Sequence, residues 1–235
     1  MKKSIKLLLN GKYENDLVDD TPLAGCNFKL LEQDLCFQYY FIMDPIFFMN
    51  ENDLTDSHKE KRARLFEKFS CLDQNFTLVV PRQFKNKFKR KFSNIHVDSI
   101  IFRSIPLISP WIDVLLVKLG FSLSSMNVIF AMLTYSLRNG FTSIYIYGAN
   151  HNWINQISVN QNNVIIYTPN GYKTYESIPL KYHDGKLLNM SDFLNTQQKN
   201  FKTHDRFSKV SNILTTNILN MSNISYITSY KRSSN

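Results

Sequence analysis

Glycine, proline and cysteine are scarce in this sequence. Seven glycines and seven prolines among 235 residues, with 43% hydrophobic residues, exclude a collagen-like, linker-rich or disordered chain. The three cysteines, Cys26, Cys36 and Cys71, are odd in number and lack metal-binding or redox spacing, which favours a reducing compartment. A chain of this length and composition predicts one α/β domain spanning residues 1–235, with a core of its own.

Long pure apolar runs are also lacking, and this argues against a membrane span or a secretory signal. The N-terminal run is interrupted by Lys6 and ends at Asn10-Gly11, so it is too short for a signal peptide. The longest stretch, from Ile100 to Leu119, contains two prolines and three charged residues. We therefore expect a cytoplasmic protein, with peripheral contact at the inner face of the plasma membrane as an option for this stretch.

Acidic residues are too few to balance the basic ones, which predicts an anionic partner. Lysine and arginine total 28 against 19 aspartates and glutamates, a formal charge of +9. Much of the excess lies between Lys85 and Lys91, which is either a solvated loop or a surface for anionic lipid headgroups or a phosphorylated glycolipid. No nucleic-acid-binding motif accompanies it, so we expect no nucleic-acid partner.

Short apolar runs and amphipathic segments alternate along the chain, which predicts a single doubly wound, mostly parallel α/β sheet. Strands are expected at Ile5–Leu9, Tyr39–Met43, Phe76–Val80, Ser143–Tyr147, Asn163–Tyr167 (an edge strand or hairpin) and Ile224–Thr228, and helices at Asp53–Phe69, Asn127–Gly140 and Asp205–Leu219. The first, second and fourth strands are continuously apolar, so we expect them to be neighbours in the sheet centre. The middle helix is apolar nearly all round and is expected to be buried.

Polar loops follow the expected strands, and open α/β sheets bind ligands at the carboxyl ends of their strands. The loops are Asn10-Gly11, Cys26-Asn27, Asp44-Pro45 and Gly148 to Trp153. A glycine lets the backbone approach a phosphate, and an asparagine offers both a donor and an acceptor. We therefore expect the three asparagines at positions 10, 27 and 150 to lie at one edge of the sheet.

One segment carries a specific motif: a helix from Asn127-Val128 to Gly140-Phe141, followed by Ile144-Tyr145-Ile146-Tyr147-Gly148-Ala149-Asn150-His151-Asn152-Trp153. It resembles a motif of bacterial polysaccharide-biosynthesis glycosyltransferases, where Gly-x-Asp-His-x-Trp follows such a helix and strand. Those proteins are similar to the family 42 sialyltransferases and to a pterin-pyrophosphokinase-like group, domain of unknown function 115. The loop at Asn27, the run from Tyr40 to Phe48 and the tail from His204 also fit, so the resemblance covers most of the chain.

The resemblance implies a Rossmann-like, sialyltransferase-type fold and a glycosyltransferase of surface polysaccharide, lipopolysaccharide O-antigen or capsule biosynthesis. The implied donor is a nucleotide-activated sugar similar to CMP-sialic acid, and the acceptor is a glycan or glycolipid. His204 is the implied general base, ahead of the last helix, and His151 is the next catalytic candidate. The expected donor-binding residues are Asn10, Gly11, Asn27, Asp44, Ser125, Asn127, Gly148 and Asn150.

Two positions depart from the family pattern. The family's first loop reads Gly-Asn-Gly-Pro-Ser, where this chain has Leu9-Asn10-Gly11-Lys12-Tyr13, and Asn150 stands where the family has aspartate. No Asp-x-Asp follows a strand, so we expect no metal or cofactor, with leaving-group charge met by backbone N–H groups, hydroxyls, Lys or Arg. One alternative is a pterin-type pyrophosphokinase, which would need Mg²⁺ and strand-end carboxylates. Another is a degenerate relative that binds a nucleotide sugar without turnover.

Overall fold

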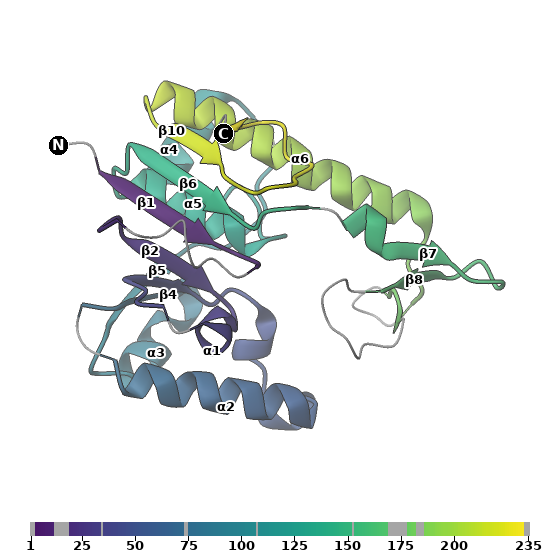
Figure 1. The fold of residues 1–235 in the computed structure, drawn as a ribbon, viewed down its shortest axis with the longest axis horizontal. Helices are drawn as coiled ribbons and strands as arrows, with labels where there is room; N and C mark the ends of the chain where they lie inside the picture. The colour runs from purple at the N-terminus through teal and green to yellow at the C-terminus, as the bar shows by residue number, and fades with distance from the viewer. Residues whose placement is uncertain are drawn as a thin grey trace.

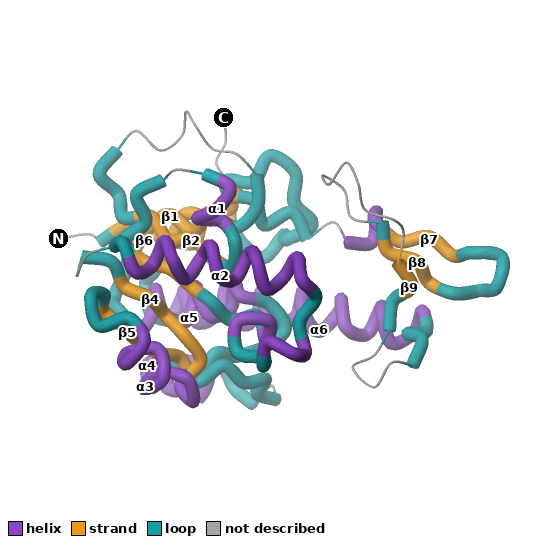
Figure 2. The backbone as a smooth tube through the Cα atoms, turned by 90° about the horizontal axis from the view of Figure 1, so that it is seen from below, coloured by secondary structure: helices purple, strands orange, loops and turns teal. Residues whose placement is uncertain are grey.

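The computed structural model describes residues 3–11, 19–33, 35–72, 75–106, 108–151, 153–168, 178–181 and 186–232. Within these residues the chain forms an eight-stranded sheet with helices on both faces, and a separate three-stranded antiparallel sheet at one end of the molecule (Figures 1 and 2). The strand order of the large sheet is β11-β10-β6-β1-β2-β3-β4-β5, and every pairing in it is parallel. The fold is therefore a doubly wound, Rossmann-like α/β fold, as predicted.

The elements have the following bounds. The large sheet contains β1 (Ser4–Leu8), β2 (Leu23–Cys26), β3 (Tyr39–Phe41), β4 (Thr77–Pro81), β5 (His96–Ile100), β6 (Ser143–Tyr147), β10 (Asn217–Asn220) and β11 (Lys231–Arg232). The small sheet contains β7 (Ile157–Val159), β8 (Ile165–Tyr167) and β9 (Ile178–Pro179). The helices are α1 (Lys29–Glu32), α2 (Asp56–Ser70), α3 (Lys85–Lys91), α4 (Pro110–Lys118), α5 (Val128–Arg138) and α6 (Met190–Ile213), with short 3₁₀ turns at Pro45–Phe47, Glu51–Asp53, Arg82–Phe84 and Trp153–Gln156.

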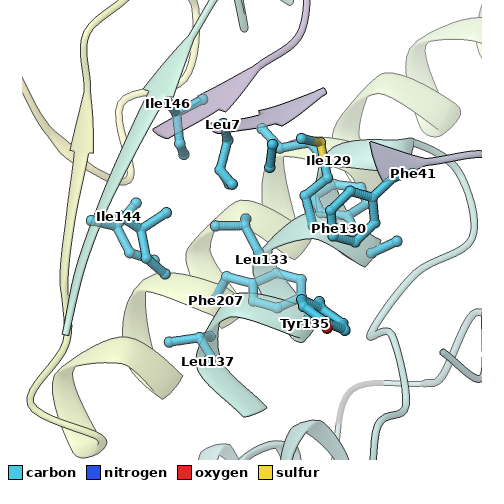
Figure 3. Close-up of a cluster of buried hydrophobic side chains, with 14 of the residues drawn as sticks. Leu7, Phe41, Ile129, Phe130, Leu133, Tyr135, Leu137, Ile144, Ile146 and Phe207 are labelled. Carbon is cyan, nitrogen blue, oxygen red and sulfur yellow. The ribbon is translucent and has the colours of Figure 1, made fainter. Parts of the chain in front are cut away.

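The parallel pair β1 and β6 lies in the interior of the large sheet, with strands on both sides. The register places Ile5 opposite Ile144 and Leu7 opposite Ile146, and all four side chains are completely buried. In Figure 3 the side chains of Leu7, Ile144 and Ile146 point toward α5 and toward Phe207 of α6. The alternating side chains of these strands thus form the floor of a core that the helices α4, α5 and α6 cover.

Helix α5 is the buried helix that the sequence predicts. The side-chain oxygen of Asn127 accepts a hydrogen bond from the backbone N of Ile129 (3.2 Å), which caps its first turn. Every residue from Ile129 to Leu137 is buried, and the hydroxyls of Thr134 and Ser136 donate to carbonyls one turn earlier. Gly140 ends the helix with a left-handed φ of 72°. An apolar helix of this kind is stable because the sheet lies on one side and α4 and α6 on the other.

Helices α1, α2 and α3 cover the opposite face of the sheet. Their core contains Leu8, Tyr40 and Val80 from the strands and a group of phenylalanines from α2 and α3. The hydroxyl of Tyr40 accepts a hydrogen bond from the backbone N of Leu30 (2.7 Å) and donates to the carbonyl of Asn27 (2.9 Å). This tyrosine therefore fixes the backbone between β2 and α1, where one of the expected binding residues lies.

The expectation that three apolar strands are neighbours is correct for β1 and β6 and wrong for β3. Strand β2 lies between β1 and β3. Its sequence Leu23-Ala24-Gly25-Cys26 is short and has weak strand propensity, so the pattern does not mark it. A Cβ atom on Gly25 would lie within 2.7 to 2.9 Å of ring atoms of Phe37 and Tyr40, so the small residue is what lets these rings pack on the strand.

The prediction for the C-terminal part is also partly wrong. Helix α6 begins at Met190, well before Asp205, and the last turns end at Ile213. The strand that follows is β10, whereas the predicted strand Ile224–Thr228 is a loop. Asn217 and Asn220 flank Ile218 and Leu219, so the sequence of β10 lacks an apolar run that would predict a strand. The segment is a strand because it pairs in parallel with β6. His204 is consequently inside α6, not ahead of the last helix.

The remaining segments agree with the predictions to within a few residues. Helix α2 is capped by Thr55, whose Oγ1 accepts from the backbone N of His58, and β4 covers the run predicted at Phe76–Val80. The strand predicted at Asn163–Tyr167 is β8, which pairs antiparallel with β7 as in the predicted hairpin; it is not an edge strand, because it lies between β7 and β9 in the small sheet. Helix α6 runs from the large sheet to this small sheet (Figures 1 and 2).

The basic run Lys85–Lys91 is the helix α3 and not a loop. Phe84, Phe88 and Phe92 recur at four-residue spacing. Phe88 and Phe92 pack with Phe66 of α2 and Phe84 stacks on Phe48, while the intervening lysines are mostly exposed. The apolar stretch after Ile100 contains helix α4, which packs with the core on the other face of the sheet. The two segments therefore lie in different helical layers. No helix in the described ranges is long and apolar enough to cross a membrane.

A buried ion pair joins α4 to α6. Arg206 donates through Nε and Nη2 to the two carboxylate oxygens of Asp113, at 3.0 and 2.7 Å, and through Nη1 to the carbonyl of Ile105 at 2.7 Å. Asp113 is 1% exposed and Arg206 is 8% exposed. A fork-to-fork pair of this kind fixes the rotation of both helices as well as their distance.

We expect Arg206→Met to lower the free energy of unfolding by about 3–5 kcal/mol, because the Asp113 carboxylate would stay buried without its partner. The double variant Asp113→Leu/Arg206→Met should lose much less, because no buried charge remains. Urea denaturation measures both. Arg64→Met is the control, because its pair with Glu60 is 4.0 Å long and exposed, and its removal should change stability by less than about 1 kcal/mol. Equal losses in the single and double variants would contradict this account.

Candidate functional site

A cavity of about 1040 Å³ opens at the carboxyl ends of the strands of the large sheet. Residues that follow β2, β3 and β4 line it together with the segment that leads into α5 and with one residue of the small sheet. The lining residues are Asn27, Met43, Asp44, Pro45, Phe48, Met49, Pro81, Gln83, Phe84, Phe102, Ser125, Met126, Asn127, Val128 and Tyr167. Four of the eight expected donor-binding residues, at positions 27, 44, 125 and 127, therefore meet in one cavity.

Asn27 has a rigid backbone and an unsatisfied side chain. Its φ is 52°, a left-handed conformation that asparagine tolerates better than most residues. The backbone N donates to the carbonyl of Phe41 (2.9 Å), and the backbone carbonyl accepts from Tyr40. The side-chain oxygen is buried and has no hydrogen-bond partner among the described residues. A buried amide oxygen without a partner is an acceptor that a bound ligand can satisfy.

Asp44 is the acidic residue of the cavity wall, as far as the described residues go. One carboxylate oxygen accepts a hydrogen bond from the backbone N of Ile46 (3.1 Å) and so caps the short turn that begins at Pro45. This bond fixes the direction of an otherwise exposed side chain. The second carboxylate oxygen is in a position to accept a hydrogen bond or a proton from a ligand hydroxyl.

Asn127 and Ser125 bring hydrogen-bond donors to the cavity. Asn127 uses its side-chain oxygen to cap α5, which leaves its amide N–H groups as donors. The hydroxyl of Ser125 lies 3.0 Å from that of Ser104, whose oxygen also accepts from the backbone N of Ser125 (3.1 Å). The start of α5 therefore presents neutral polar groups to the same cavity that Asp44 faces.

The remaining donor-binding candidates form a second group beside the cavity, at the ends of β1 and β6. The side-chain amide of Asn10 donates to the carbonyl of Gly148 (3.4 Å), so the two loops lie side by side as expected. The buried ammonium of Lys29 donates to the carbonyl of Gly11 and pairs with Glu32 at 3.3 Å. None of the described residues of these two loops is among the residues that line the cavity. Lys12 and Tyr13 of the altered first loop, and Asn152, lie outside the described residues, and so does the side chain of Trp153.

The loop after β6 is fixed by the C-terminal segment. The backbone N of Ala149 donates to the hydroxyl of Ser222 (3.0 Å), and the hydroxyl of Ser225 donates to the carbonyl of Ala149 (2.6 Å). The carbonyl of Asn150 accepts from the backbone N of Tyr226 (3.0 Å). The segment at 222–226, expected to contain a strand, is thus a loop whose hydrogen bonds hold the family-like motif in place.

The two histidines proposed as catalytic residues contact each other in the core. Nε2 of His204 lies 3.1 Å from Nε2 of His151, and Nδ1 of His204 lies 2.9 Å from the hydroxyl of Tyr230. His204 is completely buried, and neither histidine lines the cavity. A general base must reach the proton that it removes. In this conformation His204 reaches His151 and Tyr230 instead of a ligand.

Burial keeps both histidines neutral. It lowers the pKa of His151 to about 4, against the opposing effect of a hydrogen bond to the backbone of Ala149. It also lowers the pKa of His204 well below the ordinary value, and the nearby His151 adds to this effect. One set of tautomers satisfies all the hydrogen bonds among these three side chains: the hydroxyl of Tyr230 donates to Nδ1 of His204, and Nε2–H of His204 donates to Nε2 of His151. Nδ1 of His151 then carries a hydrogen and donates it to the backbone of Ala149.

Sequence reasoning overlooked several cavity residues. Pro81 and Gln83 directly follow the predicted strand at Phe76–Val80, so the strand-end rule used for the other loops also applies to them. Tyr167 reaches the cavity from the small sheet, and no local pattern indicates that. Nowhere in the described residues do three or more His, Cys, Asp or Glu side chains gather to hold a metal ion.

Comparison with known proteins adds no relative to this picture. A scan against protein-family models, a search of curated proteins and a search of solved structures found no match to the chain. The case for a function therefore rests on the fold, the cavity and the residues that line it.

We expect the buried histidines to make the protein less stable in acid. Their pKa values are lower in the folded than in the unfolded chain, so below about pH 6.5 the unfolded chain binds protons first. The free energy of unfolding should then fall by about 1.4 kcal/mol per pH unit for each such histidine, toward the folded pKa of about 4 for His151. His204→Gln should show a shallower loss between about pH 7 and pH 5 in urea denaturation.

The matched control for this experiment is His58→Gln, on the exposed surface of α2. It should keep the full slope of the wild-type protein between the same two pH values. If His204→Gln and the wild-type protein lost equal stability on acidification, the histidine chain would not be the source of the pH dependence.

Proposed function

We propose that this chain is a glycosyltransferase that binds a nucleotide-activated sugar in the cavity at the carboxyl edge of the sheet. In this proposal it transfers the sugar to a glycan or glycolipid of a surface polysaccharide. The observation that carries the proposal is the cavity lining: Asn27 follows β2, Asp44 follows β3, and Ser125 and Asn127 precede α5, yet all four face one space. The Rossmann-like fold supports it, because such sheets bind nucleotides at this edge.

The chemistry of the lining suits a sugar joined to a nucleotide. The cavity is of the size of a cofactor or nucleotide-sugar site. The amides of Asn27 and Asn127 match sugar or ribose hydroxyls, which are both donors and acceptors. Phe48 and Phe84 stack with ring centroids 4.1 Å apart and planes 7° apart, and they give one wall a flat aromatic surface for a base. The leaving phosphate would be stabilised by neutral donors such as Ser125 and the amide of Asn127.

Asp44 is the residue of the described lining best placed to take the proton of the acceptor hydroxyl. A base must lie within hydrogen-bonding distance of that hydroxyl, directly or through one water molecule. Asp44 is on the cavity wall and His204 is sealed in the core. We therefore assign proton acceptance to Asp44, and to the pair of His204 and His151 the positioning of α6 and of the loop after β6.

A second candidate function is nucleotide-sugar binding without transfer. It is favoured by the first loop, where the backbone carbonyl of Gly11 accepts a hydrogen bond from the ammonium of Lys29 and three of the five residues of the family pattern are replaced. A pterin-type pyrophosphokinase has less support, because phosphoryl-transfer sites gather several carboxylates around the phosphates. Asp44 is the single carboxylate of the described cavity lining.

The first test is donor binding. A thermal-shift screen with CMP, UDP, GDP and their sugars should identify a ligand, because a ligand at a hundred times its Kd adds about 2.7 kcal/mol to stability. Asn27→Gly should then weaken binding of that ligand about fivefold to tenfold in calorimetry, as expected for one lost hydrogen bond. Glycine is chosen because it adopts the left-handed φ of this position without strain.

The control for donor binding is Asn86→Ala, on the exposed side of α3, which should bind as the wild-type protein does. Failure of every nucleotide sugar to raise the melting temperature would exclude the proposal. The proposal would also be excluded if Asn27→Gly bound the nucleotide sugar with unchanged affinity and the cavity bound a ligand that is not a nucleotide sugar.

The second test is the assignment of the base. Asp44→Asn keeps the side-chain oxygen that caps the turn at Pro45, so the fold and donor affinity should survive. The transfer rate should fall by a factor of about 10² to 10⁴, as is typical when a positioned base is removed. His204→Gln should keep the transfer rate of the folded protein within a few-fold. Normal turnover by Asp44→Asn, with loss in His204→Gln, would reverse the assignment. Tight donor binding with no transfer in the wild-type protein would favour the second candidate.

A further inference from the structure

Helix α4 exposes several large apolar side chains, although its single acidic residue, Asp113, is buried. The exposed apolar residues on the helix and its ends are Ile108 (58% exposed), Trp111 (72%), Ile112 (38%), Leu115 (57%) and Leu119 (59%). They recur at three- and four-residue spacing, so they lie along one face, which is called the α4 face below. A contiguous exposed apolar surface of this kind is typical of an interaction site.

The buried ion pair explains why this face points outward. Asp113 must face α6 to meet Arg206, and Val114 and Val117 face the core beside it. Trp111 and Leu115 are left on the outer side by the geometry of the helix. The rotation of α4 is thus fixed by a strong internal interaction. The exposure of its apolar face is therefore a property of the folded chain.

Basic residues border the α4 face. A second cavity, of about 660 Å³, lies between the segment that leads into α4 and one side of α6. Lys199, Lys202 and Lys209 line it, spaced so that they share the side of α6 that carries Arg206. These three lysines are called the α6 stripe below. Two further exposed cations belong to the same part of the sequence: Arg103 precedes the apolar residues, and Lys118 is the last residue of α4.

The acidic residues near this surface do not cancel its charge. Asp205 also lines the second cavity, and its carboxylate accepts a hydrogen bond from the hydroxyl of Ser229 at 2.6 Å. Asp113 is buried and neutralised by Arg206. The surface therefore combines an apolar helix face with an excess of positive charge, on a chain whose net charge is +9.

We propose that the α4 face and the α6 stripe dock the protein on an anionic lipid bilayer. The apolar side chains would enter the boundary between headgroups and acyl chains, and the lysines would meet lipid phosphates at the second cavity. A second copy of the chain fits less well. A two-fold interface brings the same surface of both copies together, so the two positively charged α6 stripes would face and repel each other. The anionic bilayer satisfies both the apolar and the charged part of the surface.

The location also deepens the proposed function. Met126 lines both the second cavity and the cavity at the carboxyl edge of the sheet where the nucleotide sugar is proposed to bind, so the two cavities adjoin. A lipid-linked acceptor held by its phosphate in the second cavity would present its sugar next to the donor. This link to the acceptor rests on the proposed function, whereas docking on lipid does not.

Vesicle sedimentation of the full-length chain tests the docking without any nucleotide sugar. The wild-type protein should bind vesicles of phosphatidylcholine with phosphatidylglycerol, bind pure phosphatidylcholine weakly, and lose affinity as salt is raised. Trp111→Ser/Leu115→Ser should bind the anionic vesicles at least about tenfold more weakly because it loses apolar insertion. Lys202→Glu/Lys209→Glu should show a loss of similar size because it reverses two charges at the surface.

The matched control is Lys87→Glu/Lys89→Glu on α3, which makes the same change in net charge in the other helical layer. It should bind within about twofold of the wild-type protein. Equal losses in the α3 and α6 variants would show attraction by net charge alone and overturn the proposed surface. So would normal vesicle binding by Trp111→Ser/Leu115→Ser.

Two further measurements keep the outcomes apart. Circular dichroism and thermal unfolding should show the α4 variant folded, because its changes are on the surface. Light scattering should show no change of mass between the wild-type protein and this variant. A dimer that becomes monomeric in the variant, with unchanged vesicle binding, would assign the α4 face to a second copy and overturn the proposal. Donor binding is measured separately by calorimetry, so failure of the proposed function would leave the docking result intact.

Discussion

The parallel pairing of β1 with β6 is the interaction on which the rest of the structure depends. It joins residues near the N-terminus to residues more than half the chain away, and its register places Leu8 opposite Tyr147 at the carboxyl edge. That register puts Asn10 within hydrogen-bonding distance of Gly148. On one face of the same pair lies α5, whose capping residue Asn127 faces the cavity. A slip by one residue would turn the apolar side chains of these strands away from the helices that cover them.

Helix α6 depends on buried polar groups as much as on apolar ones. Arg206 pairs with Asp113 on one side of the helix, and His204 contacts His151 and Tyr230. Both arrangements are fully hydrogen-bonded, which is the condition under which polar groups are tolerated in a core. They also decide what reaches the surface. The first turns α4 so that its apolar face is outward, and the second withdraws the predicted general base from any ligand.

The candidate site shows how far strand-end reasoning extends. Asp44 follows a strand that the apolar pattern predicts, and Asn127 begins the buried helix, so apolar runs locate both residues without any knowledge of their distance. Asn27 follows β2, which that pattern does not mark, so its place in the cavity is decided by the tertiary structure. The same pattern could not place His204, because a histidine in a polar stretch reads alike whether it begins a helix or lies inside one. Only the packing of α6 against Tyr230 and the loop after β6 buries its ring. Sequence reasoning missed Tyr167 for a related reason, since it reaches the cavity from the small sheet, which is separate from the large sheet in the part of the chain that the structure describes.

The sequence by itself determined the α/β class, the buried helix at 128–138, the paired central strands β1 and β6, and the polar strand-end loops, because hydrophobic periodicity and capping residues are local signals. It did not reveal β2, whose small residues conceal a strand, or β10, whose asparagines resemble a loop. Both are strands because neighbouring strands supply hydrogen-bond partners on each side. Tertiary structure also decided which polar residues face solvent and which face each other. Burial of Asp113, His151 and His204 depends on partners that lie far away in the chain, and no local pattern encodes such partners.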